Sequence, residues 1–367
     1  MFASTYRHVH LARSLVLDRI AVEGPSAMGT VDLRTARSVW SAPGLPALSE
    51  RLCAIINAGK PGALYTFRTI AARISLIVVV VFCVWIGAAQ AAETLAEHVL
   101  IIGCDGFGSI GITPTNTPIL HKLMRQGAYT LHARGVMPTS SSPNWASMIM
   151  GAGPEQHGVT SNDWETNKFE IAPVTVGSGG MFPTIFGLLR EQRPKAWIAC
   201  VHDLDGFGRL LEPRAPDLIE NVKGSPATAR RAAEVIRQHK PTFLFIHFDD
   251  VDHAGHEFGW LSPEFFQAVS KMDDLIGSLL DALTEAGIRE QTVVIMSADH
   301  GGKDKTHGGP TMEELEIPFI IAGPGIKAGH ELKSPVNTYD TAATVALLFG
   351  LAPPEAWIGK PIREALN

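Results

Sequence analysis

The sequence contains few cysteines, no excess of positive charge, and no apolar run long enough to span a membrane. Four Cys among 367 residues exclude a dense disulfide framework. The formal net charge of −6 leaves no basic footprint, so nucleic acid is not an expected partner. The apolar run from Leu76 to Ile86 has 11 residues, whereas a membrane helix needs about 20. Beyond residue 95 there is no internal repeat, low-complexity tract or Pro/Gly-rich linker, which predicts one domain.

Residues 68–91 nevertheless contain the three parts of a secretory signal. Arg68 and Arg73 are the basic region, the apolar run follows, and Ala89-Gln90-Ala91 forms an A-x-A cleavage site. We therefore predict a signal peptide and a periplasmic or secreted protein. The membrane becomes a partner only if this segment stays uncleaved as an anchor.

The signal segment begins unusually late, behind 67 residues that mix Arg, Pro and Gly without a sustained period. A gene start assigned too far upstream explains residues 1–67, and a genuine N-terminal extension is the alternative. The remaining residues, 92–367, are enough for one large α/β domain. Cys104 and Cys200 lie in this part and are expected either as buried small apolar residues or as one bridge in an oxidising compartment.

From residue 97 onward, short apolar segments alternate with amphipathic ones. The expected strands cover residues 98–104, 129–136, 196–201, 242–248, 292–298 and 317–323. The expected helices cover residues 117–127, 142–153, 182–192, 225–240, 262–287 and 338–350. The first helix has Thr117 as N-cap and Pro118 in its first turn. This alternation predicts an α/β fold, a three-layer α/β/α sandwich with a mainly parallel central sheet.

Carboxylate and imidazole side chains follow the carboxyl ends of several of these strands, the edge at which open α/β sheets bind ligands. Each short group alone is also compatible with an ordinary strand-ending turn. Taken together they favour a dinuclear transition-metal centre. The six candidate ligands are Asp105, Asp252, His256, Asp299, His300 and His307.

The segment DDVDHAGHEFG leaves a choice of ligands open. We expect Asp252 and His256 to come together through a tight Gly turn. His253 is a rival imidazole, and Asp249 and Asp250 are rival carboxylates.

Ser141 lies immediately before a helix expected to start at Pro143. Thr139, Ser140 and Ser142 compete with it as N-caps. A Ser hydroxyl beside a metal can act as an alkoxide nucleophile, and a helix N-terminus presents N–H groups to an incoming phosphate. The combination predicts a hydrolase of small phosphate esters.

The chain from about Glu97 to Leu348 resembles the alkaline phosphatase superfamily, most closely its nucleotide pyrophosphatase/phosphodiesterase branch. The similarity lies in VLIIGCDGFG, TPILHKLMRQGAYT and MPTSSSPNWASMIMGAGPEQHGVTSN, and in the later IPFIIAGPGI and DTAATVALLFG. It implies an alkaline phosphatase-like fold. It also implies that Ser141, two residues before Pro-Asn, is the nucleophile where the branch usually has Thr, and that Asn162 binds the phosphoryl oxygen.

The same resemblance implies two metal sites, with Zn²⁺ favoured and Mn²⁺ or another divalent metal as the alternative. Their implied ligands are Asp252, His256 and His307 for the first ion, and Asp105, Asp299, His300 and Ser141 for the second.

The sequence departs from its relatives at two places. Ser142 occupies the position where nucleotide-handling members carry a base-stacking aromatic, and Trp145 replaces the Arg of the sulfatase motif. No Lys or Arg adjoins Ser141, Asn162 or Asp252 to bind the extra charge of a monoester. We therefore predict a phosphodiesterase. A phosphomonoesterase and a non-catalytic binding protein of the same fold remain as alternatives.

Several large side chains near the predicted site could either line a leaving-group pocket or belong to the core. These aromatics are Phe107, Trp145, Trp164, Phe258 and Trp260. Asp205 and Arg209, which follow the strand at 196–201, are further candidates for substrate contact.

Overall fold

The structure is a computed structural model that describes residues 94–177 and 179–367. The predicted extension (1–67) and signal segment (68–91) lie outside the described residues. Within the described ranges, no helix has both the length and the apolar character that crossing a bilayer requires.

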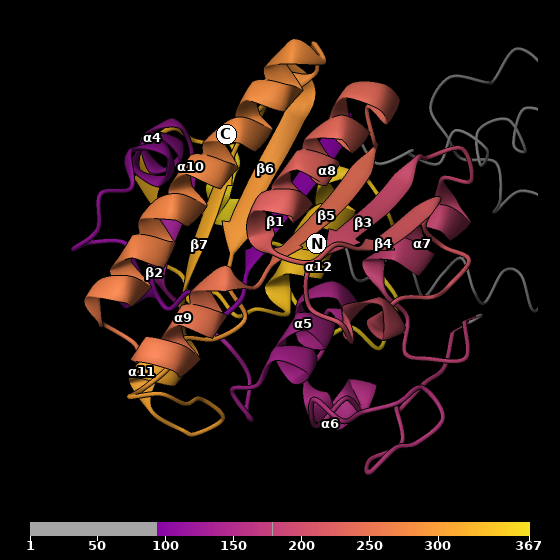
Figure 1. Ribbon diagram of the computed structural model, residues 1–367. Helices are drawn as coiled ribbons and strands as arrows, with labels where there is room; N and C mark the ends of the chain where they lie inside the picture. Colours follow the sequence, from indigo (N-terminus) through magenta and orange to yellow (C-terminus); the bar gives the residue numbers. More distant parts are fainter. Residues whose placement is uncertain (1–93, 178) are drawn as a thin grey trace, which may run out of the picture. The chain divides into compact units, whose positions relative to one another are not determined.

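An eight-stranded sheet runs through the middle of the described domain (Figure 1). Its strands are β1 (His98–Cys104), β2 (Ala128–Arg134), β3 (Ile198–His202), β4 (Leu218–Asn221), β5 (Phe243–Phe248), β6 (Thr292–Ser297), β7 (Glu316–Ala322) and β8 (His330–Glu331). They are arranged in the order β4-β3-β5-β1-β6-β7-β2-β8. Only β7 runs antiparallel to its neighbours. The prediction of a mainly parallel sheet is confirmed.

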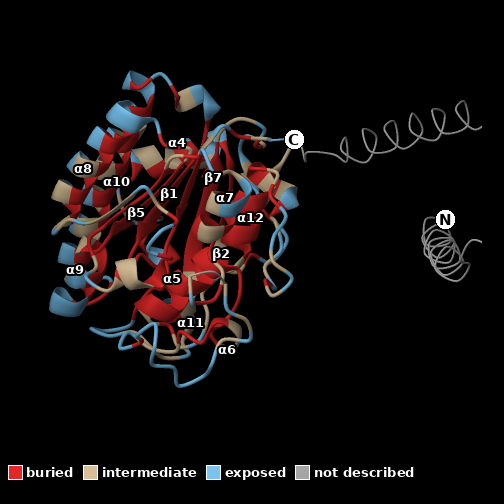
Figure 2. Ribbon diagram, turned by 90° about the vertical axis from the view of Figure 1, so that its right-hand side faces the viewer, coloured by how far each residue is buried: buried red, intermediate tan, exposed pale blue. Residues whose placement is uncertain are grey.

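Helices cover both faces of this sheet and complete the three layers (Figures 1 and 2). Helices α4, α8 and α10 pack together on one face, and α5, α7 and α12 on the other. The α-helices are α4 (Pro118–Gln126), α5 (Ser141–Met150), α6 (Pro154–His157), α7 (Ile185–Gln192), α8 (Ser225–His239), α9 (Asp250–Phe258), α10 (Pro263–Glu285), α11 (Met312–Leu315) and α12 (Asp340–Leu348). Four 3-10 turns join them: η2 (Ser109–Gly111), η3 (Phe207–Leu210), η4 (Arg289–Gln291) and η5 (Arg363–Ala365).

The core lies between these layers, where the central strands are buried on both faces (Figure 2). Every residue of β5 and β6 is buried, as the continuous apolar runs predict for parallel strands covered by helices. Cys104 and Cys200 are buried free thiols. The structure therefore agrees with the small-apolar interpretation and does not contain the alternative bridge.

The start of α5 differs from its prediction. The helix begins at Ser141 instead of Pro143, and Ser140 is its N-cap without a side-chain capping bond. All ten residues of α5 are buried. Ser141 is therefore the first residue of a helix that is enclosed by the protein.

The expected Gly turn between Asp252 and His256 is wrong. Both residues lie on α9, four positions apart and therefore on one helical face. Gly255 lies inside this helix. The residue must be glycine because a Cβ there would lie 2.6 Å from the ring of Trp260. A close contact with an aromatic side chain, and not a turn, requires this glycine.

Candidate metal centre

The six predicted ligands converge at the carboxyl ends of the parallel strands, at the lower edge in Figure 1. Asp105 directly follows β1, and Asp299 and His300 follow β6. Asp252 and His256 come from α9, which follows β5, and His307 comes from the loop between β6 and α11. Strands that neighbour one another in the sheet thus bring distant parts of the chain to one place.

The inner part of the cluster is fully enclosed. His300 Nε2 lies 3.3 Å from Asp105 Oδ1 and 3.2 Å from Asp299 Oδ2. Ser141 Oγ lies 3.4 Å from Asp105 Oδ1 and 3.3 Å from His300 Nε2. The Ser141 hydroxyl therefore faces the same point as these ligands.

The outer part of the cluster opens towards solvent. Nitrogen and oxygen atoms of Asp252, His256 and His307 lie within 4.8 Å of one another. The side chain of His256 is 44% exposed. Asp252 also lies within 4.8 Å of Asp105 and His300, so the two parts adjoin each other.

All three imidazoles are held in one tautomer. In each ring Nδ1 lies against a backbone carbonyl, which can only accept a hydrogen bond, so Nδ1 carries the proton. These bonds join His256 to Lys305 (3.0 Å), His300 to Gly301 (2.7 Å) and His307 to Thr139 (2.8 Å). In the neutral rings the Nε2 lone pairs are then free for a metal, as in histidine ligands that are oriented by a second hydrogen bond.

The cluster gathers three buried carboxylates, Asp105, Asp252 and Asp299, around the single enclosed imidazole of His300. Asp252 Oδ1 and Asp299 Oδ2 are buried and find no hydrogen-bond partner among the described residues. Burial, followed by repulsion from Asp105, raises the pKa of Asp252 to about 8 and holds the pKa of Asp299 well above its usual range. Such oxygens are costly to bury unless a cation accompanies them. The donors present, carboxylate oxygens and imidazole nitrogens, fit divalent transition metals.

Gly106 allows the two parts of the cluster to approach. Its φ of 66° is in the left-handed region, and a Cβ there would lie 2.7 Å from Asp252 Oδ1. Its N–H donates to Asp299 Oδ1 at 3.2 Å. The Asp105-Gly106 pair thus supplies a ligand and the space for its neighbour.

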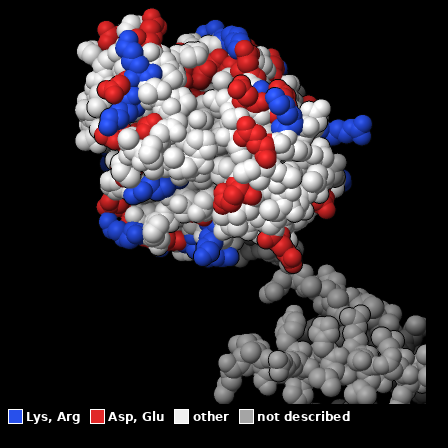
Figure 3. Space-filling view, turned by 90° about the horizontal axis from the view of Figure 1, so that it is seen from below, with Lys and Arg blue, Asp and Glu red and all other residues white. Residues whose placement is uncertain are grey.

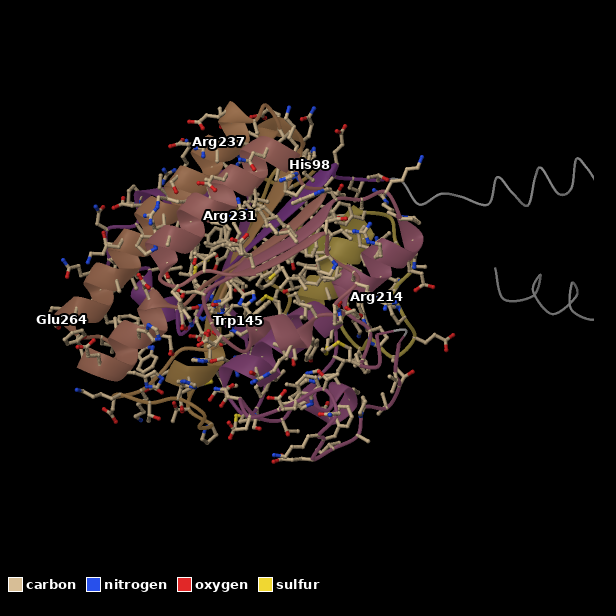
Figure 4. The ribbon with its side chains drawn as sticks, turned by 45° about the vertical axis from the view of Figure 1, so that its right-hand side comes forward. His98, Trp145, Arg214, Arg231, Arg237 and Glu264 are labelled. Carbon is tan, nitrogen blue, oxygen red and sulfur yellow. The ribbon has the colours of Figure 1, made fainter. Side chains whose placement is uncertain are left out.

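Two residues hold Asp105 in a way that the sequence did not predict: His247 was not singled out, and Trp145 was expected only in a pocket wall or the core. His247 Nε2 and Trp145 Nε1 each lie 3.0 Å from Asp105 Oδ2, which leaves Oδ1 for Ser141 and the metal side. Burial acts to raise the pKa of Asp105, but the hydrogen bond with His247 and the adjoining imidazole of His300 hold it well below its usual range. Figure 4 shows Trp145 in the interior near the ends of the strands.

Side-chain atoms of Asp105, His247 and Asp249 also lie within 4.8 Å of one another and could hold a metal. However, Asp105 Oδ2 already faces the two N–H groups of His247 and Trp145. We therefore interpret His247 as a hydrogen-bonded support for Asp105.

The rival ligands of α9 do not join the outer cluster. His253 pairs with Asp249 at 3.2 Å, and its side chain is 69% exposed. Asp250 accepts the N–H of Ser225 at the start of α8. The structure thus groups Asp252 and His256, and not their rivals, with His307.

Asn162 lies beside the nucleophile candidate. Its Oδ1 accepts the N–H of Ser142 at 2.8 Å, which leaves its Nδ2 free to donate to a ligand. Within the described chain, Nδ2 has no acceptor. Asn162 is thus placed next to the N-terminus of α5, where a phosphate would meet the backbone N–H of Ser141 and the amide of Asn162.

No Lys or Arg adjoins Asn162 in the sequence, but the fold brings one next to it. Arg209, on η3, donates a hydrogen bond from Nη2 to the backbone carbonyl of Asn162. Its Nη1 lies 3.5 Å from Glu165. Asp205, the other candidate after β3, forms an ion pair with Lys223 on the surface.

Most of the aromatic candidates belong to the core and not to an open pocket. Of the five, only Phe258 is exposed, at 46%; the buried ones are Phe107, Trp145, Trp164 and Trp260. Trp260 packs against the rings of His256 and His307, with centroids 5.2 and 6.1 Å apart. On the lower face, Lys and Arg lie towards the edge and uncharged residues form most of the middle (Figure 3).

A three-layer sandwich with adjoining carboxylate–imidazole groups and a Ser at a helix N-terminus defines an alkaline phosphatase-like protein with a candidate metal centre. The family model described as type I phosphodiesterase/nucleotide pyrophosphatase matches residues 99–198 and 190–315. Because these segments cover more than half of the chain, the chain belongs to that family.

Individual relatives agree with this assignment. Rat (Rattus norvegicus) ectonucleotide pyrophosphatase/phosphodiesterase family member 1 is 27% identical over 226 residues, which are 57% of this chain and 24% of the rat protein. The chain thus aligns with about a quarter of that relative's length.

Solved structures confirm the alkaline phosphatase-like fold. Murine ectonucleotide pyrophosphatase/phosphodiesterase 5, as an inactive variant in complex with AMP, has a TM-score of 0.63 at 16% identity, covering 74% of this chain and 100% of that chain. A variant of the alkaline phosphatase PafA has a TM-score of 0.61 at 12% identity, covering 75% of this chain and 100% of that chain.

Proposed function

We propose that this protein is a two-zinc hydrolase of small phosphate esters, chiefly phosphodiesters, that works through a phosphoseryl intermediate on Ser141. The observation that carries the proposal is the position of Ser141 Oγ, 3.4 Å from Asp105 Oδ1 and 3.3 Å from His300 Nε2. The same residue begins α5, so its hydroxyl lies beside the candidate ligands and at the positive end of the helix.

The proposed ligands divide between an open and an enclosed ion. They are Asp252, His256 and His307 for the open ion, and Asp105, Asp299, His300 and Ser141 for the enclosed one. When bound, two divalent metals would lower the pKa of the Ser hydroxyl and stabilise the leaving oxygen. Two imidazoles in one site and one in the other favour zinc over harder metals.

Ser141 and its surroundings carry the remaining chemistry. The Ser141 hydroxyl loses its proton to solvent and Oγ attacks phosphorus in line, so the Oγ–P bond forms while the ester P–O bond breaks and the leaving oxygen takes up a proton to become the alcohol. Asn162 Nδ2 and the N–H of Ser141 hold the phosphoryl oxygens during this exchange, since the N–H of Ser142 is donated to Asn162 Oδ1. Water then attacks phosphorus and breaks the Oγ–P bond, which restores Ser141 and releases the phosphate product.

The diester preference is supported by the charge around Asn162. Arg209 is the cation found there, and Glu165 at 3.5 Å offsets its charge, so a monoester dianion gains little. Ser142 is only 2% exposed. Position 142 is therefore enclosed, and a nucleobase could not stack on a side chain there. Replacing Ser142 by an aromatic residue would not by itself create a base-stacking surface.

Two alternatives remain as outcomes of one experiment. Purified protein is analysed for metal and assayed with bis-p-nitrophenyl phosphate and p-nitrophenyl phosphate. We expect two ions per chain and a higher kcat/KM for the diester. A higher value for the monoester would indicate a phosphomonoesterase, and bound metal without turnover would indicate a binding protein.

The nucleophile has its own test. Ser141→Ala should keep fold and metal content and lower turnover by several orders of magnitude, because the covalent step is lost. Ser140→Ala is the matched control, since Ser140 makes no side-chain capping bond and should retain activity. Equal activity of Ser141→Ala and the natural protein would exclude Ser141 as the nucleophile.

We also propose export to the periplasm or the medium. The support is the basic, apolar and A-x-A order of residues 68–91. Mass spectrometry of the exported protein should find a first residue close to Ala92. A mature N-terminus before Arg68 would contradict the signal-peptide interpretation.

A further inference from the structure

Arg209 connects the loop after β3 to the residue that would bind the phosphoryl group. Its Nη2 donates to the backbone carbonyl of Asn162, and Asn162 Oδ1 accepts the N–H of Ser142. Three residues distant in sequence thus form one hydrogen-bonded path that ends beside the Ser141 nucleophile.

The geometry indicates that Arg209 is committed to this loop. Its Nη1 faces Glu165 at 3.5 Å, on the same loop as Asn162. Its Nε is buried and has no partner among the described residues. An unpaired buried donor carries a cost, so the guanidinium is not placed as an ordinary solvated surface charge.

The loop held by Arg209 is also anchored by the buried Trp164, but Asn162 itself lies at its surface. Asn162 and Glu165 are exposed, and Phe169, Ile171, Val174 and Val176 further along are exposed apolar side chains. Without an anchor at the carbonyl of Asn162, the side-chain amide has only its bond to Ser142 to keep Nδ2 aimed at a ligand. A fixed amide is worth more than a mobile one because its ordering does not have to occur during binding.

We propose that Arg209 is a positioning residue: by holding the backbone of Asn162, it fixes the amide that binds the phosphoryl oxygens. The proposal deepens the proposed function and rests on its assignment of Asn162. Arg209 acts through Asn162 and not by direct contact with substrate charge.

A double-mutant cycle tests this path. The variants are Arg209→Ala, Asn162→Ala and the pair, each loaded with zinc. We expect Arg209→Ala to lower kcat/KM roughly tenfold, by the same factor for bis-p-nitrophenyl phosphate and p-nitrophenyl phosphate. In the Asn162→Ala background the same change should have almost no further effect.

Matched variants separate positioning from general damage. Arg214→Ala removes an exposed Arg on the connection between β3 and β4, at the periphery in Figure 4, and should change nothing. Arg209→Lys keeps the charge and a donor, so it should recover part of the lost activity. If Arg209→Ala fails to fold, the double-mutant cycle with Asn162→Ala is measured with Arg209→Lys instead.

Binding of inorganic phosphate to the zinc-loaded protein, measured by titration calorimetry, gives a readout that needs no turnover. Arg209→Ala should weaken phosphate binding only when Asn162 is present. Additive losses in the cycle, or a loss confined to the monoester, would overturn the proposal while leaving the hydrolase function intact. Coupled phosphate affinities without any turnover would support the positioning role and reject the hydrolase function.

Discussion

At the scale of single residues, the two oxygens of Asp105 have different tasks. Oδ1 faces Ser141 and His300, and Oδ2 is held by the N–H groups of His247 and Trp145. Because a carboxylate rotates about one bond, fixing Oδ2 also fixes the direction of Oδ1. The buried support therefore determines the geometry of the candidate metal site.

We expect His247→Gln to lower metal affinity about 10- to 100-fold while leaving the fold intact, because Asp105 loses one of its two supports. Zinc titration against a competing chelator measures the change. His253→Gln is the control, since its side chain is 69% exposed and should alter affinity little. Equal losses in both variants would remove the special role of His247.

Gly106 offers a second test at this scale. Gly106→Ala adds a Cβ 2.7 Å from Asp252 Oδ1 at a residue with φ of 66°. It should therefore lose metal as well as stability. Gly287→Ala is the control, because Gly287 has φ of 72° but nothing within 4 Å of its added Cβ, so it should cost only the roughly 1–2 kcal/mol of left-handed backbone. Metal analysis and urea unfolding of both variants separate the two effects.

The ligands could be proposed from the sequence because each follows a strand end as a polar interruption of an apolar pattern. His247 gave no such signal. It is part of the apolar strand segment TFLFIHF, and only the pairing of β5 with β1 places it beside Asp105. Arg209 was singled out as a candidate for substrate contact, but its contact with Asn162 depends on a loop conformation that local sequence does not specify.

At the scale of elements, the N-terminus of α4 shows how one helix can cap another. Thr117 occupies the expected N-cap position but makes no side-chain capping bond. Asp273, from α10, accepts the N–H groups of Ile119 at 2.9 Å and Leu120 at 2.8 Å instead. Packing of α10 on α4 thus satisfies N–H groups that the chain leaves open locally.

Asp273→Ala should destabilise the protein by about 1–3 kcal/mol, because it leaves these two N–H groups without their acceptor. Asp273→Asn keeps one acceptor oxygen and should cost less. Urea unfolding measures both. A loss below 0.5 kcal/mol for Asp273→Ala, within the range of ordinary surface changes, would show that water replaces the carboxylate.

The same carboxylate predicts a pH dependence. Burial raises the pKa of Asp273, and the two backbone N–H bonds that would lower it do not offset this. When a carboxyl group has a higher pKa in the folded protein than in the unfolded chain, its protonated form stabilises the folded state. This contribution is fully present at a pH below the pKa of the unfolded chain, and it is lost as the pH rises through the pKa of the folded protein. The natural protein should therefore lose stability relative to Asp273→Asn as pH rises from about 4 towards 7. A constant difference across this range would contradict the burial argument.

Every predicted strand and helix is present, but several further elements were missed. The strands β1, β5 and β6 and the helices α8 and α10 lie within one or two residues of their predicted bounds. Helix α9 was missed because DVDHAGHEF combines a Gly with weak helix formers, and its packing against Trp260 and α10 overrides that preference. Strand β4 was missed because it has only four residues, LIEN, and none of them is fully buried, so it has no apolar pattern.

At the scale of the whole molecule, the sheet topology creates the site. Strands β5, β1 and β6 are consecutive neighbours in the sheet, although about 140 residues separate β1 from β5 and about 190 separate β1 from β6. Their carboxyl ends deliver Asp252, Asp105 and Asp299 to one edge. The alternation of strands and helices predicted this layered architecture and the edge that carries the ligands. It did not predict which neighbours pair.

The metals should therefore contribute to the stability of the whole domain. Without them, Asp252 Oδ1 and Asp299 Oδ2 are buried oxygens that the described residues leave unpaired, and cations that bind only the folded state stabilise it. At a free zinc concentration of about 100 times Kd, each site should add roughly 2.7 kcal/mol. For a domain of this size that is a rise in Tm of about 5–10 °C for each ion. Thermal melts with EDTA and with buffered free zinc measure the shift.

Asp299→Ala should retain the open site and show roughly half the shift, with about one ion per chain. A Tm independent of zinc in the natural protein would mean that the carboxylate cluster is not a metal centre.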